Sequence, residues 1–156
     1  MTGITVHVCR AEGTDPEVPL PELGTPGSAG ADLRANLPEE LRAAGLVIPG
    51  GGWRLVPLGL ILEIPPGHEG QIRPRSGLAL RSGITVLNSP GTIDSDYRGP
   101  VGVILVNHGD RDYTVAHGCR IGQLVVSPVT RVAFREGGAI TRTRRGPGGF
   151  GSTGVD

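Results

Sequence analysis

Two short apolar runs rich in β-branched residues, 84–87 and 103–106, most constrain how this chain can fold. Such residues favour pleated, half-buried strands over helices. The segment between the runs has turn-forming residues at both ends, at 88–91 and at 98–100. The pattern therefore predicts a β-hairpin-like element that carries carboxylates and Tyr97 near its bend.

The rest of the chain repeats this pattern of short apolar runs separated by turns. Its 156 residues include 27 glycines and 14 prolines, which is typical of one domain built from short strands. A strand is expected where Ile4, Val6 and Val8 alternate with polar residues, and a loop is expected over 12–27. Other expected elements are a short helical turn at 39–44, strands at 53–57 and 58–64, and a turn and strand at 115–126.

Charge and hydropathy exclude several classes of partner. The chain has 15 basic and 15 acidic residues, so no overall field favours nucleic acid or a membrane surface. No apolar run approaches the ~20 residues of a membrane-spanning helix, and the first residues do not form a signal peptide. Two cysteines do not make a disulfide framework. We therefore expect a cytoplasmic protein.

The cysteines allow one metal hypothesis. Cys9 and Cys119 each lie two residues after a histidine, His7 and His117. Thiolate and imidazole are the ligands that zinc prefers. The spacing is not one of the common zinc patterns, so the sequence disfavours a zinc site.

Three polar stretches could carry chemistry, and each also has an ordinary structural explanation. Asp94, held beside a sheet edge, could act as a general base, or it could be a solvated turn residue. Residues 75–77, Arg-Ser-Gly, suit an anion such as phosphate, or they could cap a short helix. Asp32 is the single acid of a small-residue stretch, and it could simply cap a turn.

Residues 136–156 differ from the rest in having seven glycines and few core residues. They are expected to form a flexible arm. Residues 145–154 resemble a phosphate-binding glycine-rich loop, but Ser152 stands where a P-loop requires lysine. Amides, hydroxyls and Arg145 could still wrap phosphates while Phe150 stacks on a base. The alternative is a disordered tail.

Five polar, glycine-containing stretches together resemble the motifs of the trimeric deoxyuridine triphosphate nucleotidohydrolases, the dUTPases. They are residues 29–35, 74–80, 91–107, 120–126 and 145–154. The resemblance spans nearly the whole chain. It implies an all-β jelly-roll subunit over 1–135, followed by a flexible glycine-rich C-terminal arm over 136–156. It also implies a homotrimer whose active sites are shared between subunits.

The resemblance assigns roles to the candidate residues. Asp94 would activate the water that attacks the α-phosphorus of dUTP, giving dUMP and pyrophosphate. Mg²⁺ would bridge the phosphates, and Asp32 would meet the metal through water. The substrate-binding positions carried over from the family are Arg75, Ser76, Gly77, Asn88, Thr92, Ile93, Tyr97, Gly102, Gln123, Arg145, Phe150, Ser152 and Thr153.

The same resemblance explains selectivity. Asn88 and the backbone of Thr92, Ile93 and Gly102 would read uracil and reject cytosine, because donor and acceptor are exchanged on the pyrimidine edge. Tyr97 would pack beneath the deoxyribose and leave no room for a 2′-hydroxyl. The implied cellular role is to limit uracil in DNA and to supply dUMP for dTMP synthesis.

Departures from the family pattern are few. Cys119 stands where an aspartate is usual, which puts in doubt any salt link at that place. Gly122 replaces a common alanine and Leu58 a frequent threonine. The rival enzyme of similar fold, dCTP deaminase, needs a glutamate ten positions after the motif-three aspartate, where this chain has Ile104. A nucleotide-sensing or protein-binding module on the same fold is the other rival.

Overall fold

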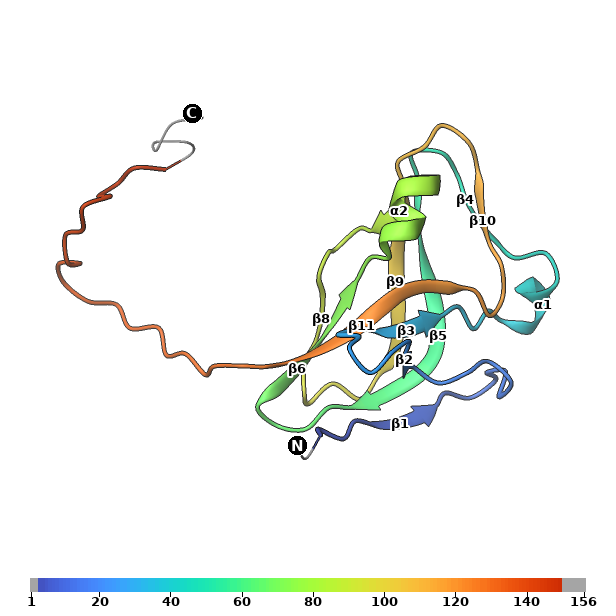
Figure 1. Cartoon of the computed structure of the whole chain (residues 1–156), viewed down its shortest axis with the longest axis horizontal. Helices are drawn as coiled ribbons and strands as arrows, with labels where there is room; N and C mark the ends of the chain where they lie inside the picture. Colours follow the sequence, from blue (N-terminus) through green and yellow to red (C-terminus); the bar gives the residue numbers. More distant parts are fainter. Residues whose placement is uncertain (1–2, 150–156) are drawn as a thin grey trace.

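The computed structural model describes residues 3–149, whose strands form an antiparallel all-β sandwich with a small third sheet (Figure 1). The first sheet has the order β1-β5-β9-β7, the second β2-β3-β11-β6-β8, and the third pairs β10 with β4. The strands are β1 (His7–Arg10), β2 (Glu22–Leu23), β3 (Ala31–Arg34), β4 (Leu46–Ile48), β5 (Trp53–Glu63), β6 (His68–Arg73), β7 (Ile84–Val86), β8 (Gly91–Ile93), β9 (Pro100–Asn107), β10 (Tyr113–Val115) and β11 (Arg120–Pro128). This architecture confirms the predicted all-β, jelly-roll-like fold.

One hydrophobic core lies between the two larger sheets. Val56 and Leu62 of β5 are 0% and 2% exposed, and they belong to the same cluster as Ile72 of β6 and Leu124 of β11. Burying an aliphatic side chain of this kind stabilises a fold by roughly 1.5–3 kcal/mol. The apolar side chains on the inner faces of the strands therefore hold the two sheets together.

Residues 53–63 form one strand where the sequence suggested two, at 53–57 and 58–64. β5 runs through the predicted break, but its pairing with β9 is irregular between Pro57 and Leu60. Gly59 lies in this irregularity with a φ of 67°, a conformation that favours glycine. A side chain on Gly59 would also collide with Thr14. The predicted break is therefore a bulge within a continuous strand.

The two β-branched apolar runs, 84–87 and 103–106, do pair. β7 lies antiparallel to β9, with Thr85 opposite Val106. Their connection is more than the predicted bend, however, because β8 pairs with β6 in the second sheet, with Thr92 opposite Gln71. Residues 87–99 therefore leave the first sheet, add an edge strand to the second and return.

The other elements match the predictions with shifted bounds. The first strand begins at His7, later than expected, and Ile4 is 53% exposed. The predicted loop at 12–27 contains the two-residue strand β2. The expected short helices are present as α1 (Glu39–Arg42) and α2 (Ser76–Ser82). Neither helix, in the described part of the chain, has the length and apolar content to cross a membrane.

Asn107 is a buried polar side chain that ties three chain segments together. It is 1% exposed, and its Nδ2 donates to the carbonyl oxygens of Ile48 at 3.1 Å and Arg111 at 2.8 Å. Its Oδ1 accepts from the amide of Gly109 at 2.9 Å. These bonds fix the end of β9 to β4 and to the turn that leads to β10.

We expect Asn107→Leu to lower the free energy of unfolding by about 3 kcal/mol, because one buried and two partly buried backbone groups would lose their partners. Urea unfolding followed by circular dichroism measures this change. The neighbouring exposed residue supplies the control, since His108→Ala is expected to change stability by less than about 0.5 kcal/mol. Equal stabilities for Asn107→Leu and the parent would contradict the assigned bonds.

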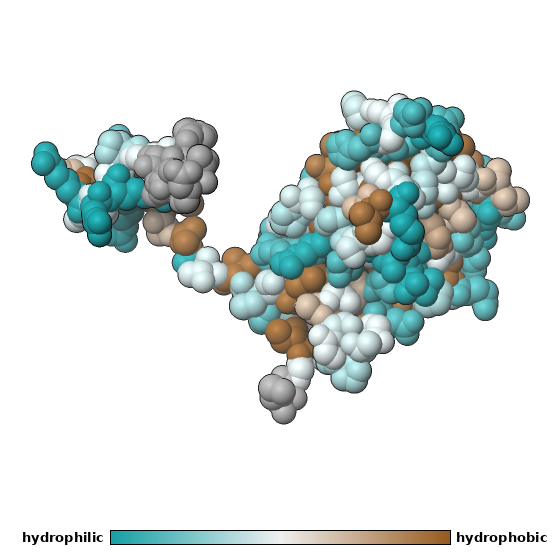
Figure 2. Space-filling view, turned by 45° about the horizontal axis from the view of Figure 1, so that its top comes forward, coloured by the Kyte–Doolittle hydropathy of each residue, from teal (hydrophilic) through white to brown (hydrophobic). Residues whose placement is uncertain are grey.

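Residues 129–149 leave the sandwich after β11 and form neither helix nor strand (Figure 1). Figure 2 shows this segment standing apart from the body of the molecule. Val132, Phe134 and Ile140 are 69%, 94% and 92% exposed, so the segment buries almost nothing against its own sandwich.

Candidate active site

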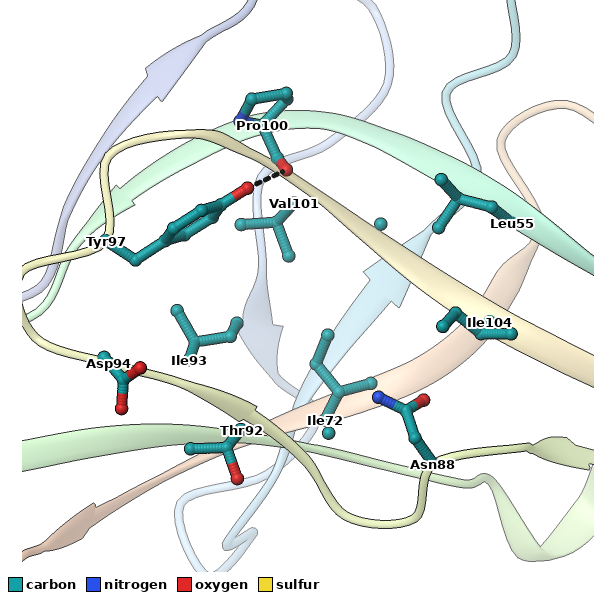
Figure 3. A pocket seen from close by; sticks show the side chains of 12 residues that line it. Leu55, Ile72, Asn88, Thr92, Ile93, Asp94, Tyr97, Pro100, Val101 and Ile104 are labelled. Atoms are coloured by element: carbon teal, nitrogen blue, oxygen red, sulfur yellow. Dashed lines mark hydrogen bonds between the residues drawn. The ribbon is translucent and has the colours of Figure 1, made fainter.

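A pocket of about 320 Å³ lies between the two larger sheets, and six residues predicted from the sequence line it (Figure 3). We call it the first pocket. One wall comes from β5 and β9, and the other from β6 and β8. The six are Asn88, Thr92, Ile93, Asp94, Tyr97 and Gly102.

The polar groups of the first pocket lie at its rim, over an apolar floor. Asp94 directly follows β8 and is exposed. Tyr97 lies across the pocket from Asp94, and its Oη donates to the carbonyl oxygen of Pro100 at 3.0 Å (Figure 3). β8 is the edge strand of its sheet, and an edge strand presents unpaired N–H and C=O groups. The arrangement suits a flat, polar-edged ligand with a carboxylate beside it.

The floor of the first pocket includes Ile104, the position at which a deaminase would carry its glutamate. Leu55, Ile72 and Val101 line the pocket with it. These aliphatic side chains cannot transfer a proton. Among the described residues that line the pocket, Asp94 is the one carboxylate.

A second pocket of about 240 Å³ gathers the other predicted residues of the sandwich. Its lining includes Asp32, Arg75, Ser76, Gly77 and Gln123. Asp32 and Gln123 face each other across the pairing of β3 with β11. Arg75 caps the start of α2 and Ser76 and Gly77 are its first two residues, so the beginning of this helix supplies a guanidinium, a hydroxyl and an amide to one place. Such a group of donors suits phosphate oxygens.

Asp32 is held by two arginines. Its Oδ1 lies 3.2 Å from Nε of Arg75, and its Oδ2 lies 3.0 Å from Nη1 of Arg120. Nη1 of Arg75 also donates to the carbonyl oxygen of Arg120 at 3.4 Å. One carboxylate therefore orients two guanidinium groups, and the three charged groups together carry a net positive charge beside the second pocket.

Gly30 allows Gln123 its place in the second pocket. A side chain at residue 30 would overlap the Gln123 amide, with Cβ only 3.0 Å from Cδ. Nε2 of Gln123 donates to the carbonyl oxygen of Pro74 at 2.9 Å. The glycine in the first motif thus leaves room for the Gln123 side chain, which bonds the residue before Arg75.

Most predicted arm residues lie outside the described part of the chain. Phe150, Ser152 and Thr153 belong to residues 150–156 and are not described. Arg145 is exposed on the arm, where its Nε donates to the carbonyl oxygen of Gly148 at 3.0 Å. It lines neither pocket.

The alternative zinc site finds no support in the described residues. Within 3–149, no three side chains of the histidine, cysteine, aspartate and glutamate types come together to hold a metal. His117 uses both ring nitrogens, with Nε2 3.1 Å from Oδ2 of Asp15 and Nδ1 accepting from the amide of Leu37. Burial raises the pKa of the Cys119 thiol, which keeps it neutral near pH 7.

Comparison with known proteins decides the family. The dUTPase family model matches residues 16–154. The chain belongs to the dUTPase family. It is 56% identical over 156 residues, all of both chains, to the deoxyuridine 5′-triphosphate nucleotidohydrolase of Roseobacter denitrificans. It is 57% identical over 154 residues to that of Rhizobium meliloti, covering 98% of this chain and 92% of the relative.

Solved structures agree on the fold of this dUTPase-family chain. The dUTPase of Staphylococcus bacteriophage 80alpha, in complex with dUPNHPP, superposes with a TM-score of 0.82 at 22% identity, over 97% of this chain and 99% of that one. A dUTPase of phage phi11 of S. aureus, whose structure describes a structural Mg(II) ion, gives 0.70 at 18% identity, over 85% and 95% of the two chains.

Sequence reasoning missed one member of the first pocket and one side chain that pairs with a residue of the second. Arg120 was noted only as part of a motif, although its guanidinium pairs with Asp32. Leu55 lies far from the motifs in the sequence but lines the first pocket beside Gly102. The predicted pairing of 84–87 with 103–106 could have indicated that β9 faces this pocket. No local signal marks Leu55, because its place depends on how β5 pairs with β9.

Proposed function

We propose that this chain hydrolyses dUTP to dUMP and pyrophosphate. The observation that carries the proposal is Asp94, a carboxylate that directly follows an edge strand and lies at the rim of a pocket of nucleoside size. The curated relatives named above, 56% and 57% identical, are dUTP nucleotidohydrolases. The residues of both pockets match the demands of that reaction.

In the proposed mechanism Asp94 accepts a proton from a water molecule, whose oxygen attacks the α-phosphorus. The bond between the α-phosphorus and the oxygen bridging to the β-phosphorus breaks, and its electron pair leaves with pyrophosphate. Arg75, Ser76 and Gln123 hold phosphate oxygens and stabilise the charge that develops on them. Asp32 keeps the Arg75 guanidinium oriented before substrate arrives, at 3.2 Å.

The first pocket would select uracil and deoxyribose. The unpaired backbone of β8 and the Asn88 amide pair with the uracil edge, and cytosine leaves buried polar groups without partners. The Tyr97 ring, held by the carbonyl oxygen of Pro100, occupies the space that a 2′-hydroxyl would need. The rejection of UTP is therefore steric, and the rejection of dCTP is electrostatic.

The donor set fits Mg²⁺ bound with the substrate. Mg²⁺ keeps several waters and is commonly held by one or two carboxylates together with substrate phosphates. Asp32, whose oxygens are engaged by two arginines, suits contact through water rather than direct ligation. When bound, the ion would neutralise negative charge on the triphosphate.

We propose that the active protein is a homotrimer with shared sites. The two pockets have no lining residue in common, so one chain holds the catalytic carboxylate and the phosphate clamp as separate parts. Several large apolar side chains are also exposed, which indicates surfaces that another chain covers. They include Trp53, Leu55, Leu80 and Phe134.

We further propose that residues 1–135 form the core and that 136–156 act as a flexible arm. Residues 136–147 are all exposed, so they are free to reach a neighbouring subunit's site. Arg145, Ser152 and Thr153 would hold the γ-phosphate end and Phe150 would cover the uracil.

The proposed reaction would limit uracil in DNA and supply dUMP for dTMP synthesis. We propose that it takes place in the cytoplasm, where free thiols such as those of Cys9 and Cys119 persist.

Pyrophosphate release from dUTP, dCTP, dTTP and UTP tests the proposed function. We expect release from dUTP to exceed release from each of the others by at least about 100-fold, because the pocket leaves mismatched polar groups unpaired. Addition of a chelator should abolish most of the activity, since the triphosphate charge would lose its cation. A malachite green assay with added pyrophosphatase measures all four rates.

Two other outcomes would overturn the proposal in different ways. Release of ammonia from dCTP would assign the site to deamination despite Ile104. Tight binding of dUTP without hydrolysis would assign the chain to a nucleotide-sensing role. The Asp94→Asn protein, purified in the same way as the parent, controls for contaminating phosphatases.

A further inference from the structure

The segment between Asp94 and Pro100 is held by contacts that the reaction itself does not require. The amide of Tyr97 donates to the carbonyl oxygen of Asp94 at 3.2 Å, which closes a turn. The Tyr97 ring then folds back over the chain, and its hydroxyl bonds Pro100 at the other end of the segment (Figure 3). The ring is 44% exposed, so the apolar core does not hold it in place.

The Tyr97 ring rests directly on Gly99. A Cβ on Gly99 would overlap Oη of Tyr97 and would lie 2.6 Å from Cζ and 2.9 Å from Cε2. Real Cβ atoms do not approach ring atoms this closely, so any side chain at residue 99 displaces the ring. Gly99 is needed here for close approach, since its φ is not in the left-handed region.

Arg98 braces the same turn from outside the pocket. Its Nη1 donates to the carbonyl oxygens of Ser95 at 2.7 Å and Tyr97 at 2.9 Å. Its Nη2 lies 3.5 Å from Oε1 of Glu63, the last residue of β5. The guanidinium therefore connects the turn to the first sheet, a geometry that the single ammonium of lysine cannot reproduce.

We propose that Gly99 is a specificity-determining position and that Arg98 and Glu63 are positioning residues for the Tyr97 ring. This inference rests on the proposed dUTP hydrolysis and deepens it, because it places the control of sugar selection outside the residues that touch the sugar. Gly99 sets how far the ring can sink toward the backbone. Arg98 and Glu63 set where the turn that carries the ring lies relative to β5.

Gly99→Ala tests the inference through the ratio of kcat/KM for dUTP to kcat/KM for UTP. The added methyl group lifts the ring and opens space at the 2′ position, so we expect the ratio to fall roughly tenfold. We expect KM to change more than kcat, because Asp94 keeps its place before the turn. Gly52→Ala is the matched control: it also adds a methyl group in a tight place, 3.2 Å from the carbonyl oxygen of Pro49, at the other end of β5.

Arg98→Lys and Glu63→Gln supply a second test that does not depend on the folding of Gly99→Ala. Both side chains are about half exposed, so the fold tolerates the changes. We expect Arg98→Lys to lower the ratio roughly threefold, because one ammonium nitrogen cannot occupy the positions of both guanidinium nitrogens, one at the carbonyl oxygens and one at Glu63. We expect Glu63→Gln to lower the ratio roughly twofold. Asp110→Asn, which removes an exposed ion pair with Arg111, is the control and should leave the ratio unchanged.

The outcomes separate this inference from the proposed function. If the parent does not hydrolyse dUTP, the proposed function fails. If the parent prefers dUTP to UTP but Gly99→Ala and Arg98→Lys keep its ratio, the positioning of Tyr97 is wrong while dUTP hydrolysis stands. A parallel loss of both substrates, with the ratio constant, would show a general structural role and would also overturn the inference.

Discussion

Asp94→Asn is expected to lower kcat for dUTP by about 100- to 10,000-fold while the Kd for a non-hydrolysable dUTP analogue stays within about twofold. Asparagine has nearly the same size and can still accept a hydrogen bond, but it cannot take the proton of the attacking water. Asp94 is exposed at the rim of the first pocket and makes no side-chain bond that the substitution would break within the described residues. Pyrophosphate release gives kcat, and titration calorimetry with the analogue gives Kd.

Asp96→Asn is the matched control for that result. Asp96 is an exposed carboxylate two residues further along the same turn, and it lines a different depression together with His68 and Glu69. The kcat of Asp96→Asn for dUTP should stay within about twofold of the parent value, because Asp96 does not line the first pocket. If Asp94→Asn turned over dUTP at the parent rate, the assignment of the general base would be wrong.

The Asp94→Asn variant can also test whether each active site is shared between two chains. Asp94→Asn lacks the base, and Arg75→Ala lacks part of the phosphate clamp, so each should be nearly inactive alone. If each site takes the first pocket from one chain and the second from another, refolding the two variants together restores part of the activity. No recovery in mixtures of confirmed trimers would show that each chain builds its own site.

Deletion of residues 144–156 is expected to lower kcat/KM for dUTP by about 100-fold and to leave Tm within about 1 °C of the parent. The deletion removes Arg145 and the glycine-rich stretch, which we propose to close over the bound triphosphate. It removes no core contact among the described residues, because 144–147 and 149 are exposed and 148 is only partly covered. A substrate titration and differential scanning calorimetry measure the two quantities.

Arg145→Ala separates the charge of the arm from its length. Loss of one guanidinium should account for part of the deletion's effect, raising KM more than it lowers kcat. Arg142→Ala, an equally exposed arginine outside the proposed motif, is the control. Parent kinetics for the truncated chain would show that the arm has no part in turnover.

Alternation of apolar residues predicted the sheets because strand faces have a period of two, and burial of one face decides the register. The pairing of 84–87 with 103–106 was predicted instead from two β-branched runs with turn-forming residues between them. The path between these runs was not predicted, since nothing local to residues 91–93 states which sheet they join. The break predicted near Pro57 was wrong because a bulge at Gly59 lets one strand continue through it.

The candidate site was predicted in pieces rather than as a whole. Motif residues such as Asp94 and Arg75 are recognisable by type and order, and the structure sorts them into two pockets. Contacts that depend on side-chain reach were not predictable, such as the bridge from Arg75 through Asp32 to Arg120. The dependence of Tyr97 on Gly99 belongs to the same class, because a missing Cβ matters only once the ring conformation is known.

The first pocket draws its walls from both layers of the sandwich, with Leu55 and Val101 on one side and Ile72 and Ile93 on the other. A nucleotide seated there touches both layers at once and binds only while they remain together. By mass action, such a ligand stabilises the folded chain by about 2.7 kcal/mol at a concentration 100 times its Kd. The supply of nucleotide would therefore set part of the equilibrium stability of the folded chain.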